Sequence, residues 1–551
     1  MKILFVTAEA WPLAKTGGLG DVAYGLTCAL ADRGHDVRLL MPAYPSARER
    51  LEGPIKYLSL GSGAGSVKGQ AQTSSTKGQA QSEGQAQISQ SEGQAPGGGQ
   101  AQPKGQAPTP SKGQAQSPAP SKGQAQSSNR YHKQKIIEGR LPGSEVSVWL
   151  LDDPELFERV GSPYATASGE PWPDNHLRFY WLSRVAAAIA AGEVLDWQAD
   201  ILHANDWQSA LAPVFLQDYS ESHQERPRTV FSIHNLAYRG IFSADVFAQL
   251  ELPAAMWNPE RLEFYGELAF IKGALTLSDA ITTVSPTYAR EIQTPAFGWG
   301  LDGLLRSRSS DLHGIINGVD TTTWDPATDP HLAANYSAPD PQAKAKNRQA
   351  IAVEIGLDDD PQSPLLGFIG RLVEQKGIDL ILGALPRLLA SGARLAILGS
   401  GDNTLERALL QAAQAHPGRV GVSIGYDEGQ AHRIEAGSDI FLMPSRFEPC
   451  GLNQLYSLRY GTPPLVNPTG GLADTVLDVD AHAGGNGFCT AAADAGSLAA
   501  TVERALSYWQ DQEAWQKIQA RGMSADYSWD RSADAYVDLY ERIRATGWQR
   551  R

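Results

Sequence analysis

The residues best suited to chemistry include two cations and a carboxylate in the second half of the chain. Arg371 and Lys376, in GRLVEQKGIDLI, follow an apolar run that is typical of a buried strand. Lys376 stands where a helix is expected to begin, and two cations beside a helix N-terminus favour a diphosphate. Glu448, in PSRFEPCGLNQ, follows a second such run and precedes another expected helix. Helix capping is the alternative interpretation of this carboxylate.

The first half offers a glycine-rich loop, KTGGLGD, at residues 15–21. It lies between a strand-like run at 3–7 and a helix-like run at 19–32, where glycines admit a ligand to the backbone and a helix N-terminus favours an anion. The lysine precedes the glycines, so the loop is not a P-loop. The stretch GLGDVA fits the loose dinucleotide fingerprint, but the next strand, DVRLLM, does not end in the acidic residue that would hold a ribose. A tight turn without a ligand is the remaining alternative.

Other polar residues follow expected strands in the same way. His234 and Asn235 end TVFSIHN, and Asp206 follows the strand of LHANDWQ. A satisfied core histidine and a helix-capping aspartate are the alternatives for these residues. Cys450 has no histidine placed to activate it as a nucleophile. The acidic runs LDDP and LDDDPQ lie among prolines, and the chain has no zinc-ligand or EF-hand spacing, so we expect no metal and no cofactor.

These candidates need a scaffold that brings the ends of several strands together. Apolar runs alternate with amphipathic stretches such as 176–195 and 206–217. This alternation predicts an α/β protein with two doubly wound parallel sheets, whose ligands bind at the carboxyl ends of the strands. The expected strands of the first half are ILFVT, VRLLM, VSVWLL, DILHAN, TVFSIHN, AITTVS and GIINGV, and those of the second half are LLGFIGR, RLAILGSG, VGVSIGY, DIFLMPS and PPLVNP.

The length of 551 residues exceeds what one hydrophobic core usually holds. We predict an N-terminal domain over residues 1–314, a C-terminal domain over 315–530, and a final helix within 531–551 whose docking the sequence does not fix. Residues 62–128 contain the tripeptide GQA eight times and few branched aliphatic residues. We interpret them as a disordered insertion in a surface loop of the first domain, with the segments near 55–60 and 133–138 as neighbours.

Charge and composition limit the classes of partner. A net charge of −14 argues against nucleic acid or an anionic membrane surface. Three cysteines make no disulfide framework, and no apolar run reaches transmembrane length. We therefore expect a cytoplasmic protein without a membrane partner, whose oligomeric state the sequence leaves unknown.

The motifs together resemble the glycogen (starch) synthases of the bacterial and plastid type, in glycosyltransferase family five. The resemblance implies a GT-B fold, in which two Rossmann-like domains face each other across a cleft. It implies transfer of glucose from ADP-glucose to the non-reducing end of an α-1,4-glucan such as glycogen, with retention of configuration and without a metal. The matching stretches span nearly the whole chain outside the insertion, in the family's order: KTGGLGDV, HANDWQ, FSIHNLAYRGIF, VSPTYAREI, INGVD, GRLVEQKGIDL, SIGYDE, PSRFEPCGLNQLYSLRYGTPPLV and TGGLADTV.

The resemblance also implies roles for single residues. Those implied in catalysis are Glu448, His234, Asp206, Arg371 and Lys376. Those implied in binding ADP-glucose are Lys15, Gly17, Gly18, Asp21, Tyr164, Asn235, Asn317, Tyr426 and Asn453.

The sequence departs from the family pattern at several positions. Asn205 and Gln208 replace two histidines that the family often shows around Asp206. Asn453 stands where many members have threonine. Tyr456 occupies the place at which related retaining families carry a second glutamate, as the glycogen synthase motif leads one to expect.

Three other functions remain open on the sequence. The first is a related transferase that uses UDP-glucose or a small acceptor such as fructose 6-phosphate. The second is a non-catalytic glucan-binding scaffold that interacts through the GQA segment. The third is an NAD oxidoreductase, which the missing ribose acid disfavours.

Overall fold

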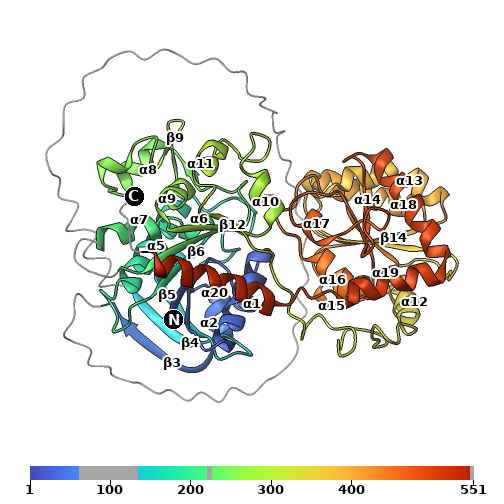
Figure 1. The fold of residues 1–551 in the computed structure, drawn as a ribbon, viewed down its shortest axis with the longest axis horizontal. Helices are drawn as coiled ribbons and strands as arrows, with labels where there is room; N and C mark the ends of the chain where they lie inside the picture. The colour runs from blue at the N-terminus through green and yellow to red at the C-terminus, as the bar shows by residue number, and fades with distance from the viewer. Residues whose placement is uncertain (61–133, 220–225, 547–551) are drawn as a thin grey trace, which may run out of the picture.

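The computed structural model describes residues 1–60, 134–219 and 226–546, and it shows two lobes that each contain a parallel β-sheet (Figure 1). The expected insertion at 62–128 lies outside the described residues. The predicted α/β class with two doubly wound sheets is confirmed. Within the described ranges, every helix is too short or too polar to cross a membrane.

The first lobe is built on a nine-stranded sheet of order β12-β11-β7-β6-β1-β2-β5-β4-β3. Neighbouring strands pair in parallel from β12 to β5, and β4 and β3 add an antiparallel edge. The central strands are continuous apolar runs because helices cover both faces. The strands are β1 (Lys2–Val6), β2 (Asp36–Pro42), β3 (Glu52–Ser59), β4 (Lys135–Arg140), β5 (Ser147–Asp152), β6 (Ile201–Asn205), β7 (Arg228–Ile233), β11 (Ala280–Thr283) and β12 (Leu312–Gly314).

Helices and a small three-stranded sheet complete the first lobe. In α1, Val22, Leu26 and Leu30 form the apolar stripe that packs into the core of the lobe. The helices are α1 (Gly18–Asp32), α2 (Pro45–Arg50), α4 (Pro154–Phe157), α5 (Asn175–Ala190), α6 (Asp206–Ser209), α7 (Ala212–Tyr219), α8 (Ala244–Gln249), η1 (Ala254–Met256), α9 (Phe270–Leu277), α10 (Pro286–Glu291) and α11 (Asp302–Ser307). The small sheet has the order β8-β10-β9, with β8 (Ile241–Phe242), β9 (Glu263–Phe264) and β10 (Glu267–Ala269).

The second lobe has a six-stranded, fully parallel sheet of order β15-β14-β13-β16-β17-β18. Its strands are β13 (Leu365–Ile369), β14 (Arg394–Gly399), β15 (Val420–Ile424), β16 (Ile440–Met443), β17 (Pro464–Val466) and β18 (Phe488–Cys489). Its helices are α12 (Lys344–Glu354), η2 (Glu374–Lys376), α13 (Ile378–Ala390), α14 (Asn403–Ala415), α15 (Glu428–Gly437), α16 (Asn453–Arg459), α17 (Gly470–Thr475), α18 (Ala495–Gln510) and α19 (Gln512–Ser524).

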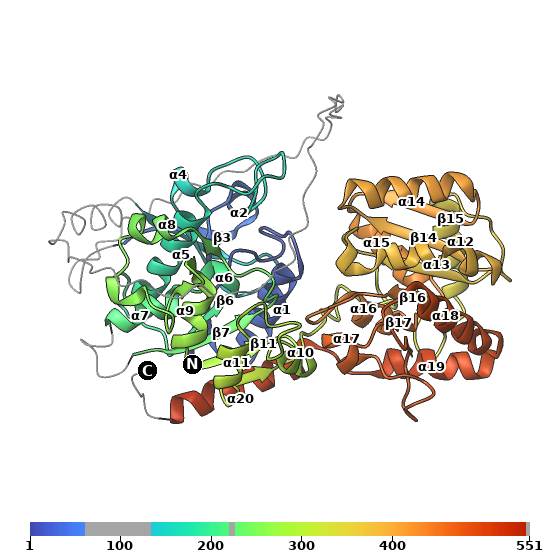
Figure 2. The same ribbon diagram turned by 90° about the horizontal axis from the view of Figure 1, so that it is seen from above.

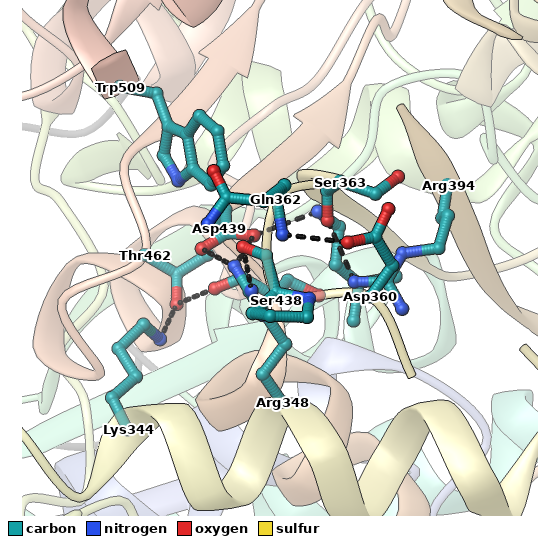
Figure 3. A network of polar contacts seen from close by, with 12 residues as sticks. Lys344, Arg348, Asp360, Gln362, Ser363, Arg394, Ser438, Asp439, Thr462 and Trp509 are labelled. Carbon is teal, nitrogen blue, oxygen red and sulfur yellow. Dashed lines mark hydrogen bonds and ion pairs between the residues drawn. The ribbon is translucent and has the colours of Figure 1, made fainter. Parts of the chain in front are cut away.

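Polar contacts fasten α12 to the second lobe (Figure 3). Lys344 is buried and donates to the hydroxyl of Thr462 over 2.6 Å, and Arg348 pairs with Asp439 at 3.0 Å. Asp439 also accepts a hydrogen bond from the backbone of Leu365 at the start of β13. The network therefore ties α12 to the central strand of the sheet.

The last helix, α20 (Trp529–Ala545), returns to the first lobe and packs along α1 (Figures 1 and 2). The hydroxyl of Tyr540 lies 2.7 Å from Nδ1 of His203 in β6, inside the core of that lobe. The chain crosses between the lobes twice, and the two crossing segments lie side by side. The backbone N–H of Val319 in the first segment donates to the carbonyl oxygen of Tyr527 in the second over 2.7 Å.

Each sheet has a point at which its strand order reverses. In the first sheet β2 pairs with one side of β1, and the chain later returns to place β6 on the other side of β1. In the second sheet β13 leads outward to β14 and β15, and β16 returns beside β13. Ligands bind outside the carboxyl ends of the strands at such switch points. The loops after β1, β6, β13 and β16 are therefore the positions to examine for a site.

Two expected elements differ from the structure. GIINGV is not a strand as a whole, because β12 ends at Gly314. The chain then turns to pass Trp529, where a Cβ on Gly318 would lie 2.5 Å from the Trp529 backbone. The helix expected at 206–217 is two helices, α6 and α7. The segments flanking the insertion are neighbours as predicted, since β3 and β4 pair antiparallel.

Candidate active site

Glu448 lies at the switch point of the second sheet, in the loop after β16. Its carboxylate accepts from Lys376 at 2.5 Å and from the hydroxyl of Ser445 at 3.0 Å, and Glu448 is only 6% exposed. The N-cap of α16 is Leu452, so Glu448 does not cap that helix and the alternative interpretation is wrong. Glu448 and Lys376, placed 72 residues apart in the sequence, are brought together by the pairing of β13 with β16.

Arg371 projects from the neighbouring loop after β13. One nitrogen of its guanidinium lies 3.1 Å from the side-chain oxygen of Gln375, and the other lies 3.4 Å from the hydroxyl of Tyr238 in the first lobe. Asn453, at the first position of α16, donates to the carbonyl oxygen of Ile369 at the end of β13. The second lobe thus gathers two cations, a carboxylate and an amide beside adjacent strand ends.

The glycine loop follows β1 in the first lobe and leads into α1. Gly17 is the N-cap of α1 and makes no side-chain capping bond, and a Cβ on Gly17 would meet nothing within 4 Å. The space beside Gly17 leaves room for an anion near the N-terminus of α1, where the helix dipole favours negative charge. Lys15 pairs with Asp21 at 2.8 Å. Burial lowers the pKa of Lys15, but the Asp21 carboxylate and other nearby groups outweigh it and raise this pKa above 10.5, so the ammonium stays charged.

Glu9 holds the glycine loop in place, and the sequence patterns did not indicate it. Its carboxylate accepts from the backbone N–H of Thr16 at 2.5 Å, from the Thr16 hydroxyl at 2.7 Å, and from the backbone N–H of Gly17 at 3.1 Å. The hydroxyl of Tyr164 donates to the same carboxylate. One buried side chain therefore positions both the loop and Tyr164, which the family resemblance had placed near the donor.

Asp206, His234 and Asn205 form a second cluster at the first switch point. Asp206 accepts from the backbone N–H of His234 over 2.8 Å, and the His234 Nε2 lies 3.0 Å from the Asn205 side-chain oxygen. The Asn205 amide nitrogen donates to the carbonyl of Val6, so its oxygen is the acceptor and the His234 Nε2 carries the proton. Asn205 is the N-cap of α6. The alternative interpretation of Asp206 as a helix-capping residue is therefore wrong.

Burial sets the ionisation of this cluster. It raises the pKa of Asp206 to about 7, although backbone N–H groups of His234 and Asn235 partly offset the effect. It lowers the pKa of His234 to about 4, so the imidazole is neutral near pH 7. Asp206 also has a φ of 53°, in the left-handed region that is uncommon for residues other than glycine. Strained backbone of this kind is concentrated at functional sites.

The first and second switch points face each other. A Cβ on Gly18 would lie 3.5 Å from Leu452 at the start of α16, and Lys15 interacts electrostatically with Tyr426. Tyr426 is 68% exposed. Asn317, at the crossing between the lobes, is buried, and its backbone N–H interacts with the thiol of Cys450.

Cys450 is poorly placed for nucleophilic chemistry. Burial raises the pKa of the Cys450 thiol to about 12, which makes it a poor nucleophile. Among the described residues, no three His, Cys, Asp or Glu side chains are grouped as a metal site would need. The Asn235 side chain accepts from the backbone N–H of Ala237, so it stabilises the turn after β7.

Comparison with protein families matches both lobes. The family model described as the starch synthase catalytic domain matches residues 2–83 and 111–307, and that of the glycosyl transferases group 1 matches residues 354–521. A glycogen synthase of Halorhodospira halophila is 58% identical over 547 residues, which cover 99% of this chain and all of that protein. A glycogen synthase of Alkalilimnicola ehrlichii is 59% identical over 544 residues, which cover 98% of each chain.

Solved structures show the same arrangement. The catalytic domain of starch synthase IV from Arabidopsis thaliana, determined with ADP and acarbose bound, aligns with a TM-score of 0.79 at 30% identity and covers 99% of both chains. A sucrose-phosphate synthase from Thermosynechococcus elongatus aligns over 99% of both chains with a TM-score of 0.55 at 16% identity, a likeness of fold alone.

Proposed function

The chain belongs to the glycogen and starch synthase family of glycosyltransferases and has its GT-B fold, and from this premise we propose that it elongates an α-1,4-glucan with glucose from ADP-glucose, retaining the anomeric configuration. The observation that carries the proposal is the set of Arg371, Lys376 and Glu448 at one switch point, opposite the glycine loop and the N-terminus of α1 at the other. A diphosphate between them would meet cations and backbone N–H groups from both lobes.

The donor and acceptor follow from the same arrangement. The related starch synthase IV was determined with ADP and acarbose, which supports an ADP-linked donor and an oligosaccharide acceptor. UDP-glucose as donor and fructose 6-phosphate as acceptor remain the alternatives. The sucrose-phosphate synthase does not favour them, because its likeness extends only to the fold.

Catalysis requires that the departing ADP be stabilised. Breaking the glucosyl–phosphate bond places negative charge on the leaving phosphate, which Arg371, Lys376 and the α1 N-terminus neutralise. The acceptor 4-hydroxyl enters on the face from which ADP departs, so configuration is retained, and a phosphate oxygen takes its proton. Glu448 lies beside the reacting sugar, where its carboxylate orients hydroxyls and stabilises positive charge on the ring.

The cluster in the first lobe orients the transferred glucose. With Nε2 donating to Asn205, the neutral His234 presents Nδ1 as an acceptor for a sugar hydroxyl. Asp206 holds the backbone of His234 in place and offers its second oxygen to the sugar. The remaining donor contacts proposed from the family motifs are those of Asp21, Asn317, Tyr426 and Asn453.

The diphosphate assignment is tested by replacing the two cations. We expect Arg371→Ala and Lys376→Ala each to weaken ADP binding by at least tenfold in isothermal titration, because charge-assisted hydrogen bonds to phosphate contribute about 1.5–3 kcal/mol each. Lys517→Ala is the control, since Lys517 pairs with Glu513 on the surface of α19. Unchanged ADP affinity in both site variants would place the diphosphate elsewhere.

Several other expectations stay predictions. They are the domain limits at 1–314, 315–530 and 531–551, the cytoplasmic location, and the lack of a nucleic-acid partner.

A further inference from the structure

Three exposed aromatic side chains gather on the first lobe, beside the residues assigned to the donor. Five aromatic residues are exposed in the described ranges, and Tyr238, Tyr265 and Trp299 are three of them, at 52%, 82% and 44%. The other two, Tyr57 and Tyr426, lie on the sheet edge and at the donor site. We call Tyr238, Tyr265 and Trp299 the aromatic platform.

The platform is one structure, although its members come from separate loops. A Cβ on Gly300 would lie 3.4 Å from the Tyr265 ring, so the turn at Trp299 packs against the β9–β10 hairpin, and Figure 1 shows β9 beside α11. The guanidinium of Arg239 lies 5.6 Å from the Trp299 ring centroid and 5.7 Å from that of Phe264, and it donates to the Trp299 carbonyl over 2.9 Å. Tyr238 precedes Arg239 in the chain.

Backbone conformation indicates that the rings are kept for a purpose other than folding. Tyr265 and Gly266 have φ values of 52° and 85°, and Trp299 and Gly300 have φ values of 51° and 83°. Consecutive positive φ values are those of a type I′ turn, which prefers Asn-Gly and disfavours a bulky first residue. The N–H of Leu301 closes the second turn on Gly298 over 2.7 Å. Each turn thus places an aromatic residue where asparagine would be more stable.

The platform continues into the proposed active site. The Tyr238 hydroxyl is within 3.4 Å of Arg371, a member of the diphosphate pair. The Trp299 ring centroid is 6.4 Å from that of Phe447, which directly precedes Glu448. A chain whose end lies beside Glu448 would therefore pass over these rings as it leaves the site.

We propose that the aromatic platform binds the glucan acceptor at glucose units beyond the one being extended. The C–H faces of a pyranose pack on aromatic rings, while the rings' polar edges and neighbouring hydrogen-bonding groups suit its hydroxyls. An α-1,4-glucan is uncharged and presents one such face at each sugar ring. Separate aromatic rings can each pack on one sugar, which a continuous apolar patch would not do. This inference rests on the proposed function, because it assumes that the acceptor is a glucan.

The test is the binding of maltoheptaose, measured by isothermal titration calorimetry. Tyr265→Asn and Trp299→Asn suit the turn backbone, so we expect both variants to keep or raise the melting temperature while affinity for maltoheptaose falls about tenfold or more. Tyr265→Phe keeps the ring and should retain affinity within about twofold. Tyr57→Ala removes a 65% exposed ring from β3, outside the platform, and should leave affinity unchanged.

Two results would overturn the inference. One is wild-type affinity for maltoheptaose in the Tyr265→Asn, Trp299→Asn double variant. The other is an equal loss of ADP affinity in that variant, which would show that the rings support the donor site or the fold. Transfer from ADP-glucose to maltose by the unmodified protein separates the two claims. If transfer occurs but the double variant binds maltoheptaose normally, the platform alone is wrong; if transfer does not occur, the proposed function is wrong as well.

Discussion

At the scale of single residues, the ion pair between Lys376 and Glu448 is the feature most directly tied to the proposed function. The ammonium and the carboxylate lie 2.5 Å apart, and Ser445 donates a hydrogen bond to the carboxylate. An incoming diphosphate would compete for Lys376 and leave Glu448 beside the sugar.

The role of Glu448 predicts the effect of Glu448→Gln. The amide keeps the shape of the side chain and can still accept from Ser445, but it loses the negative charge. We expect the rate of glucosyl transfer to fall at least a hundredfold, about 2.7 kcal/mol of transition-state stabilisation. Initial rates and circular dichroism of the variant, with exposed Glu513→Gln as the control, measure this. Near-normal turnover in a folded Glu448→Gln protein would remove Glu448 from the mechanism.

The raised pKa of Asp206 predicts a dependence of stability on pH. Its carboxyl has a pKa of about 7 in the folded protein and an ordinary value of 3.8. The folded state binds this proton more tightly, so the associated stability is complete below pH 3.8 and is lost as pH rises through about 7. Between pH 5 and pH 8 the wild type should lose about 2–3 kcal/mol relative to Asp206→Asn in denaturant unfolding. A constant difference between the two proteins over this range would contradict the shifted pKa.

The sequence indicated many of the site residues because polar residues that follow apolar runs lie at strand ends. Glu448, Lys376, Arg371 and Asp206 all follow strands in this way. The sequence patterns did not indicate Glu9, although it comes just after β1, because it belongs to no motif. Its carboxylate accepts hydrogen bonds from the loop that precedes α1. The four groups that donate to Glu9 are brought together only by folding, so the spacing of residues in the sequence does not predict them.

At the scale of elements, two short helices join the lobes by capping each other. Asp474 of α17 accepts from the backbone N–H and the hydroxyl of Thr287 in α10, over 2.8 and 2.6 Å. Glu291, at the end of α10, accepts from the hydroxyl of Thr469 and the backbone N–H of Gly470 at the start of α17, over 2.9 and 3.0 Å. Each carboxylate thus satisfies N-terminal donors of the other lobe's helix. Figure 2 shows α10 and α17 where the lobes meet.

Asp474→Ala should weaken this junction. It leaves the N-terminal donors of α10 without their acceptor, and the loss of such a cap typically lowers the free energy of unfolding by about 1–2 kcal/mol. Thermal unfolding measures the change. The matched control is Glu513→Ala, which removes one partner of an exposed ion pair within α19. An unchanged melting temperature for Asp474→Ala would show that the cap contributes little to stability.

The sequence predicted the central strands of each sheet. It did not predict the segment whose conformation depends on contacts where the two lobes meet. Continuous apolar runs such as ILFVT and DILHAN correctly indicated central strands, because their burial depends on helices nearby in the chain. GIINGV failed as a strand because the chain there must pass Trp529, more than two hundred residues away. Contacts between distant segments leave no periodic signal in a local stretch of sequence.

At the scale of the whole molecule, the chain crosses between the lobes and then returns. The last helix, α20, packs on α1, and Trp529 leaves no room for a Cβ on Gly25 of that helix. The first lobe is therefore completed by residues that follow the second. The alternation of strands and helices predicted both sheets, but the docking of this last helix depends on buried contacts such as that between Tyr540 and His203.

Removal of the GQA segment should leave a working protein. The strands on either side of it pair through Ser59 and Lys135, so the chain leaves and re-enters the lobe at adjacent points. Closing a loop of about 67 residues rather than about five costs only roughly 2 kcal/mol more, because closure entropy grows logarithmically with length. Replacing residues 62–128 with a short Gly/Ser turn should therefore raise the melting temperature slightly or leave it unchanged.

The effect of this deletion on function is measured by initial rates of glucosyl transfer to two acceptors. Rates on a short maltooligosaccharide and on glycogen should both match those of the full chain. Loss of folding, or of rate on the short acceptor, would show that residues 62–128 are part of the enzyme. Loss on glycogen alone would instead assign them a role in tethering the polymer.

The most direct test of the central claim is the product formed from a labelled donor. Purified protein is incubated with maltoheptaose and either ADP-glucose or UDP-glucose, both labelled with ¹³C in the glucose, and the new linkage is observed by NMR. We predict transfer from ADP-glucose to the non-reducing end through an α-1,4 bond, with release of ADP and much slower use of UDP-glucose. The absence of transfer, a β linkage, or a preference for UDP-glucose would contradict the account.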